Sequence, residues 1–283
     1  RQDVDVRARP GYLAPTESEA RAAGMESNRA GAKPVPPPAV TKALDAIAPA
    51  RGNLPIRIQA IGARNTIRAI VEVDPATAKL PEWSGGGTLK VTFEPERGAG
   101  GPVATSTMAP VDVQSVSQPF DIGARSTLID GPERPLPPGR YAVRAELMPR
   151  GGRTPIQVTT FVSVPPEASE VGNGGLASKR GPSTGLAYMP TADPRFRRTE
   201  RLRIEVPLAA DGFSGTGRLL TATGQPTPVV VTLTTRVDET TKQSYAVGDV
   251  TLAPLAVGEY VVELAIVKGG KTETVTYGFR LIP

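Results

Sequence analysis

Residues 265–272, AIVKGGKT, match the spacing of a phosphate-binding loop. In such a loop, backbone amides and a lysine at the start of a helix surround the phosphates. Alternating apolar residues lie on both sides of Gly269 and Gly270, which predicts two strands and no helix. Because no helix N-terminus faces the anion, we expect a tight hairpin turn here.

Two further motifs resemble enzyme fingerprints. Residues 181–185, GPSTG, have the spelling of a nucleophile elbow around Ser183, but the chain has no histidine to act as the base. Residues 172–177, GNGGLA, imitate a dinucleotide-binding motif that lacks its preceding strand and following helix. We expect residues 181–185 to form a loop and residues 172–177 to belong to a linker. The chain also has no cysteine, which excludes disulfides and thiolate sites, and we predict no catalytic residue and no cofactor.

Two pairs of carboxylates offer oxygen ligands of the kind that Ca²⁺ prefers. Asp3 lies near Asp5, and Glu167 lies near Glu170. Two carboxylates make a weak site, and no Asp-x-Asp-x-Asp-Gly loop is present. We therefore expect solvated surface at both places and no metal site.

The densest charged feature is a run of arginines between residues 195 and 203. Leu202, Ile204 and Val206 alternate with the later arginines, which predicts a strand with a wet arginine face. The alternative is a patch for an anionic partner such as an acidic glycan or a lipid headgroup. The candidate residues for that patch are Arg195, Arg197 and Arg198.

Alternation of apolar and polar residues with a period of two dominates the chain from residue 54 onward, and aromatic residues make up only 5% of the sequence. This pattern is typical of half-buried strands bounded by glycine and proline turns. The chain is therefore expected to be all-β. The predicted strands are residues 54–60, 67–73, 89–93, 111–122, 141–147, 156–164, 202–206, 217–221, 229–235, 245–252, 260–267 and 274–281.

An internal repeat relates residues 136–165 to residues 255–283. In each copy a strand led by tyrosine, Tyr141 or Tyr260, precedes a Gly-Gly turn and a second strand. Both copies are expected to be hairpins whose paired glycines supply positive φ angles, with the tyrosines as half-buried anchors. The repeat predicts two tandem sandwich domains, Ig-like or fibronectin-III-like. We place them at residues 54–166 and 179–283, with a linker at residues 167–178.

The N-terminal part has a different composition. Residues 1–15 contain one alternating strand without a local partner, and residues 16–53 form a proline-rich arm with short helices predicted at residues 16–25 and 41–47. A tethered strand can add to a sheet edge in another protein or another copy of the chain. The candidate partner-binding residues in that strand are Val4, Val6, Arg7 and Arg9.

Four segments resemble the region that follows the A domain in bacterial, acidobacterial-type von Willebrand factor A-related proteins. They are VDVRARPGYLAP from residue 4, ALDAIAPARGNLPIRIQA from residue 43, LPPGRYAVRAEL from residue 136 and RFRRTERLRIEV from residue 195. The resemblance implies an exported protein and makes residues 1–15 the end of an A domain. The metal-binding Asp-x-Ser-x-Ser triplet of that domain is absent, so metal-dependent adhesion is not carried over.

Charge and hydropathy narrow the classes of partner. The net charge of +5 comes from 33 basic and 28 acidic residues spread along the chain, which does not indicate a nucleic-acid-binding protein. No apolar run approaches 18 residues, so no transmembrane segment is expected, and Arg1 is not followed by a signal-peptide core.

We expect a non-enzymatic, extracellular or envelope-associated module for adhesion, scaffolding or subunit assembly. Its partners would be other proteins or copies of itself. One alternative is an accessory subunit of a larger envelope complex. Another is a protein that binds a nucleotide or anion through residues 270–272.

Overall fold

The computed structural model describes residues 35–96, 113–210 and 212–283. The chain divides into two compact units, Arg1–Val35 and Pro36–Pro283, and the helices and strands named here belong to the second. The predicted strand with Val4, Val6, Arg7 and Arg9 and the predicted helix at residues 16–25 lie outside the described residues. The described part is mostly strand, which confirms the all-β prediction.

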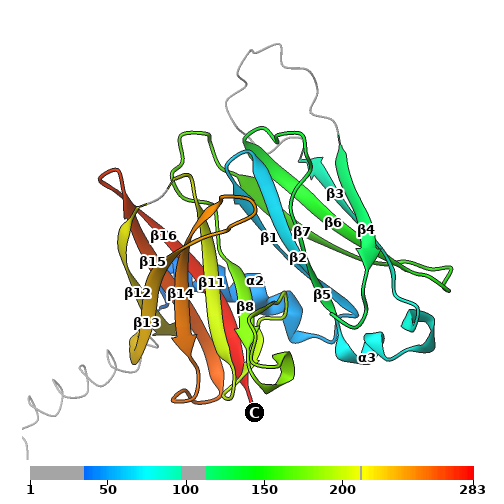
Figure 1. Ribbon diagram of the computed structural model, residues 1–283. Coiled ribbons are helices and arrows are strands. Elements are labelled where there is room, and N and C mark those ends of the chain that lie inside the picture. The colour runs from blue at the N-terminus through cyan, green and yellow to red at the C-terminus, as the bar shows by residue number, and fades with distance from the viewer. Residues whose placement is uncertain (1–34, 97–112, 211) are drawn as a thin grey trace, which may run out of the picture. The chain divides into compact units, whose positions relative to one another are not determined.

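The first seven strands form two sheets that face each other, and we call this part the first lobe (Figure 1). One sheet has the order β1–β2–β5 and the other β4–β3–β6–β7. Ile67 and Val71 of β2 lie in one apolar core with Leu89 of β3 and Val143 of β6. The bounds are β1 Ile56–Ala63, β2 Thr66–Val73, β3 Gly87–Pro95, β4 Gln114–Phe120, β5 Ser126–Ile129, β6 Gly139–Pro149 and β7 Ile156–Val164, with α3 Pro75–Ala78 and the 3-10 turn Pro81–Trp83 between β2 and β3.

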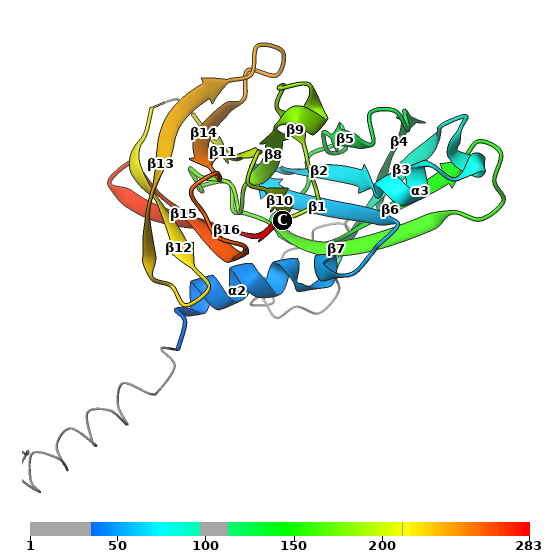
Figure 2. The same cartoon turned by 90° about the horizontal axis from the view of Figure 1, so that it is seen from below.

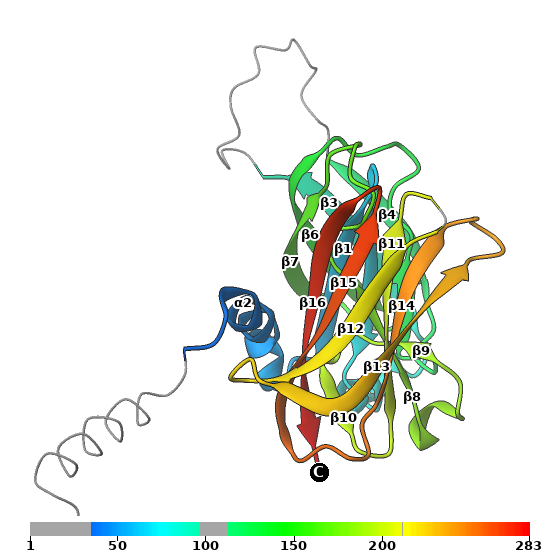
Figure 3. The same cartoon turned by 90° about the vertical axis from the view of Figure 1, so that its left-hand side faces the viewer.

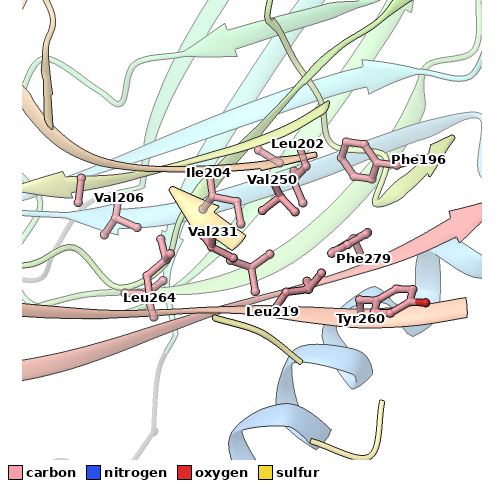
Figure 4. Packing of buried hydrophobic residues seen from close by; sticks show 14 of the residues in the cluster. Phe196, Leu202, Ile204, Val206, Leu219, Val231, Val250, Tyr260, Leu264 and Phe279 are labelled. Atoms are coloured by element: carbon pink, nitrogen blue, oxygen red, sulfur yellow. The ribbon is translucent and has the colours of Figure 1, made fainter. Parts of the chain in front are cut away.

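The other nine strands form one sheet, the second lobe, with the order β10–β16–β15–β12–β13–β14–β11–β8–β9. The pairing of β12 with β13 is irregular, and the sheet folds over there so that its halves face each other. Ile204 of β11 and Leu264 of β15 meet in the core (Figure 4). The bounds are β8 Leu176–Arg180, β9 Met189–Pro190, β10 Arg195–Arg197, β11 Arg201–Leu208, β12 Ser214–Thr221, β13 Pro226–Val237, β14 Ser244–Thr251, β15 Gly258–Lys268 and β16 Lys271–Ile282, with a 3-10 turn at Pro182–Thr184.

The two Gly-Gly turns differ from each other. Gly269 and Gly270 have φ angles of 56° and 75° and join β15 to β16 by a two-residue turn, which confirms the hairpin predicted at residues 265–272. The prediction of positive φ at Gly151 and Gly152 is wrong, because β6 and β7 are joined by a longer loop. Its turn closes where the Gly152 N–H donates to the Pro149 carbonyl at 3.1 Å, a geometry that needs no left-handed residue.

The repeated tyrosines make the same contact in both lobes. The Tyr141 hydroxyl donates to the Pro137 carbonyl at 2.9 Å, and the Tyr260 hydroxyl donates to the Ala256 carbonyl at 3.0 Å. Each bond ties the start of a strand to the loop four residues before it. Both tyrosines are buried, more deeply than the half-buried anchors that the sequence predicts.

Helix α2, Pro38–Ile47, covers the outer face of the second lobe (Figures 2 and 3). Its buried residues Val40, Ala43 and Ile47 share one face, and Val40 and Ala43 pack against Leu220 of β12 and Val261 of β15. The helix lies close to β16, because a Cβ on Gly278 would come within 2.4 Å of the Ala43 carbonyl oxygen. A 3-10 turn at Ala48–Arg51 then leads toward β1.

Four strands have no counterpart in the predicted set: β5, β8, β9 and β10. Strand β8 begins at Leu176, within the predicted linker. These strands are short, and Gly, Pro and Ser surround them, so their alternation is too brief to mark a strand in the sequence.

Candidate functional site

Strand β2 is buried on both faces, and its second face forms the contact between the lobes. Ile67, Val71 and the other inward residues lie in the core of the first lobe. Ile70, on the opposite face, packs against Leu176 of β8 and Ala192. Arg68 and Glu72 flank Ile70 on that face and are both at least nine-tenths buried. The contact between the lobes therefore buries charged as well as apolar side chains.

Glu72 is the centre of the polar part of this interface. Its Oε2 accepts hydrogen bonds from the Thr191 hydroxyl at 2.7 Å and from the backbone N–H groups of Ala192 at 2.9 Å and Asp193 at 3.0 Å. Its Oε1 lies 3.4 Å from the Lys179 ammonium. A buried carboxylate is stable only when its lone pairs are satisfied in this way. The loop at residues 191–193 is thus fastened to β2.

A second set of charges continues the network. The Arg57 guanidinium is only 3% exposed and lies 3.3 Å from Asp74 and 3.9 Å from Asp193. Arg195 makes two parallel bonds to Asp193, with its Nη2 2.8 Å and its Nε 2.9 Å from the carboxylate oxygens. Burial raises the pKa of Asp193, but the hydrogen bonds from Arg195 and the charge of Arg57 outweigh it and lower the pKa below its ordinary value. Asp193 therefore joins the two lobes as a carboxylate.

The Gln59 side chain of β1 makes hydrogen bonds to the backbone at the start of β8 that a neighbouring strand would otherwise make. Its side-chain amide donates to the Gly175 carbonyl at 2.8 Å, and its Oε1 accepts the Ala177 N–H at 3.1 Å. Elsewhere along the interface, the Asn173 N–H donates to the Gly62 carbonyl at 2.8 Å. Backbone groups that would otherwise be buried without partners are satisfied across the two lobes.

Elsewhere in the interface, two guanidinium groups lie close to one aromatic ring. The centroid of the Tyr245 ring is 5.4 Å from Arg68 of the first lobe and 4.8 Å from Arg236 of the second. Arg68 also bonds to Asp130, and Arg236 to Glu205. Because both cations are paired and the ring is fully buried, this contact stabilises the interface through stacking.

A cavity of about 330 Å³ lies beside the charge network. Its walls come from α2, β1, β7 and β16, and they include Ala46, Ala60, Phe161 and Tyr277. A groove of about 870 Å³ shares several of these residues and extends the cavity along β7 and β16, past Lys42 and Arg140. Volumes of this size suit a ligand or a short segment of chain.

Tyr277 is a residue of the cavity wall whose pKa departs strongly from the ordinary value. Burial, with a smaller effect from the charges of Asp193 and Glu72, raises the pKa of its phenol. The ring also packs against the core of the second lobe. The phenol therefore stays neutral.

The predicted arginine patch is divided by the fold. Arg195 is held by Asp193, as described above, while Arg198 donates two bonds to the Ala253 carbonyl, at 2.7 and 3.0 Å. The Arg197 side chain is exposed, and its backbone N–H donates to Glu200. Farther along, Leu202, Ile204 and Val206 enter the core, as the strand prediction requires. Arg203 is half-buried and pairs with Asp249 instead of lying on a fully wet face.

Asn173, Gly174 and Gly175 of the predicted motif at residues 172–177 line the cavity, whereas Ser183, Lys271, Glu167 and Glu170 do not. Ser183 lies in a 3-10 turn and its hydroxyl donates to Glu200 at 3.3 Å. Lys271 starts β16 at an exposed turn. Glu167 and Glu170 are exposed, and within residues 35–96, 113–210 and 212–283 no group of three or more acidic side chains is arranged to hold a metal.

The interface residues Arg57, Arg68 and Glu72 are absent from the candidates that the sequence suggests. They alternate with apolar residues, as charged residues on the wet face of a strand do. The nearest signal in the sequence is the unusually apolar run at residues 69–71, where both faces of β2 carry apolar residues.

No protein-family model matches the sequence, and a search of curated proteins finds no match. No helix in the described part of the chain is both long and apolar enough to cross a lipid bilayer.

Proposed function

We propose that the chain is a non-enzymatic, extracellular or envelope-associated module in which two Ig-like or fibronectin-III-like sandwiches are joined as a scaffold for subunit assembly. Strand order supports the two sandwiches. The orders β8–β11–β14–β13 and β12–β15–β16 correspond to strands A–B–E–D and C–F–G of an immunoglobulin domain. In the first lobe, β1–β2–β5 corresponds to A–B–E and β3–β6–β7 to C–F–G.

The tyrosine contacts support the same assignment. A tyrosine near the start of strand F that bonds back to the preceding loop is a feature of these domains. Tyr141 begins the F-like strand β6, Tyr260 begins the F-like strand β15, and each bonds to a carbonyl four residues before it. The tyrosine of the repeat therefore makes the same contact in both copies.

The observation that carries the scaffolding role is the burial of Glu72 and its partners between the lobes. A linker without such contacts would leave two sandwiches free to turn independently. Here five charged side chains pair with one another at the contact, so that the two lobes present their surfaces in one arrangement. These side chains are Arg57, Glu72, Lys179, Asp193 and Arg195.

The assembly role is tested by sedimentation velocity of the full chain over a range of concentrations, beside a chain that lacks residues 1–34. The truncation ends before α2, because Val40 is buried against the second lobe. We expect the full chain to associate and the truncated chain to remain a folded monomer. A full chain that stays monomeric at every concentration contradicts the proposal.

A further inference from the structure

We propose that the outer edge of β16, between Thr272 and Gly278, binds an extended peptide segment of a partner protein as an added strand. This inference rests on the assembly function proposed above and specifies how the partner is held. The site is the cavity and groove that α2, β7 and β16 enclose.

The direction of the backbone groups follows from one hydrogen bond. The Arg280 N–H donates to the Pro194 carbonyl at 2.8 Å, on the side of β16 that faces β10 and away from β15. In an antiparallel strand the N–H and C=O of one residue point to the same side, and neighbouring residues alternate. Gly278, Thr276 and Thr274 therefore direct their backbone groups to the same outer edge.

That edge is open along most of its length. Strand β10 pairs with β16 in parallel, but only opposite Arg280, Leu281 and Ile282. Among the described strands, none pairs with the outer edge of residues 272–278. An unpaired edge is a template for another strand. A ligand strand would continue the line that β10 begins.

The space beside the edge has the lining that a peptide strand requires. Residues 276–278 line the cavity, and residues 273–276 line the groove. The facing walls carry small apolar side chains, including Ala43, Ala46 and Ala60, with Phe161 at the mouth. Small side chains leave room for a backbone to approach, and main-chain bonds then supply affinity while the walls select side chains.

The charges around the site favour a neutral segment. At the inner end, the carboxylates of Asp193 and Glu72 are already paired with Arg195, Arg57 and Lys179. Arg57, the one charged residue among the described residues that line the cavity, is paired with Asp74, so the cavity offers no unpaired charge to an ionised ligand side chain. Lys42 and Arg140 lie only along the outer groove.

The test uses a displayed library of random seven-residue peptides, selected on the full chain and counter-selected on a Thr276→Pro variant. Proline removes only the outward N–H of residue 276 and leaves the bonds to β15, and Thr276→Ala is the matched control that keeps the N–H. Affinities of the enriched synthetic peptides are measured by fluorescence anisotropy.

We expect peptides of alternating small apolar residues that bind Thr276→Ala within about threefold of the parent and Thr276→Pro at least tenfold more weakly. Amide exchange at Thr274 and Thr276 should slow on binding. If Thr276→Pro does not fold, Ala46→Trp, which fills the cavity from α2, replaces it and should weaken binding as strongly.

Two results overturn the inference: no peptide enriched over the variant, or enriched peptides that bind parent and variant equally. Failure here is distinguishable from failure of the assembly function. A chain that associates in sedimentation but binds no peptide retains its scaffolding role and loses this site. A chain that binds peptide but never associates loses the role of self-assembly and keeps the site.

Discussion

The backbone N–H of Asp193 donates to the carboxylate of Glu72 at 3.0 Å, although the two residues are 121 positions apart in the sequence. Glu72 lies near the end of the first lobe's β2, and Asp193 precedes β10 of the second lobe. A buried carboxylate that collects backbone donors from another lobe fixes the position of that backbone, because breaking the contact leaves the donors unsatisfied.

Replacing Glu72 by alanine is expected to lower the free energy of unfolding by about 3–5 kcal/mol, the usual cost of removing one partner from a buried charge network. The loss leaves Lys179 and the N–H groups of Ala192 and Asp193 without their acceptor. Urea denaturation, monitored by circular dichroism, measures this change in the free energy of unfolding. The matched control is Glu94→Ala on the exposed face of β3, expected to change stability by less than about 0.5 kcal/mol. Equal effects from the two variants would refute the central role of Glu72.

Asp193 should make stability depend on acidity. Its pKa in the folded chain is lower than the value of about 3.9 expected when unfolded. Such a group contributes stability that is present above about pH 4 and is lost as the pH falls through the lowered pKa. Melting temperatures from pH 7 to pH 2 should fall more steeply for the parent than for Asp193→Asn, while the exposed Asp45→Asn should follow the parent. Parallel curves for the parent and Asp193→Asn would contradict the assignment.

The hydrogen bonds of Tyr141 and Tyr260 should contribute independently to the free energy of unfolding. Tyr141→Phe and Tyr260→Phe each remove one hydroxyl donor and are expected to cost about 1 kcal/mol. Because the residues lie in different lobes, the double variant should show the sum. Tyr277→Phe, whose hydroxyl bonds to no other described residue, is the control and should be close to neutral at pH 7. A clearly non-additive double variant would show that the two contacts are coupled.

The approach of α2 to β16 predicts a large difference between two glycines. Gly278→Ala places a Cβ within 2.4 Å of the Ala43 carbonyl oxygen and must displace the helix, at a cost of about 1–3 kcal/mol. Gly151→Ala meets nothing within 4 Å and should be tolerated. Thermal unfolding of both variants measures the difference. Similar melting temperatures would show that α2 adjusts freely on β16.

The longer strands and the hairpins were predictable because they depend on neighbouring residues. The alternation around Ile67 and Val71 predicts β2, and Gly269–Gly270 predicts the turn between β15 and β16, from local pattern alone. The same local logic fails at Gly151–Gly152, where the length of the loop decides the backbone geometry.

The interface was not predictable, because burial there depends on a partner far away in the chain. Arg68 and Glu72 have the alternation of a wet strand face, and only the packing of the second lobe against β2 buries them. Arg195 was not predictable for another reason, because its partner is close in the sequence but gives no signal there. The sequence suggests a free cation, and the fold gives it Asp193, two residues earlier, as a bidentate partner.

The most direct test of the scaffold is the distribution of distances between the two lobes. The chain has no cysteine, so a double variant with cysteine at the exposed positions Lys90 of β3 and Thr234 of β13 can be spin-labelled at those sites alone. Pulsed electron paramagnetic resonance should give one narrow distance distribution, which broadens when Glu72→Ala is added under conditions where both lobes remain folded. A broad distribution before that change would contradict the account.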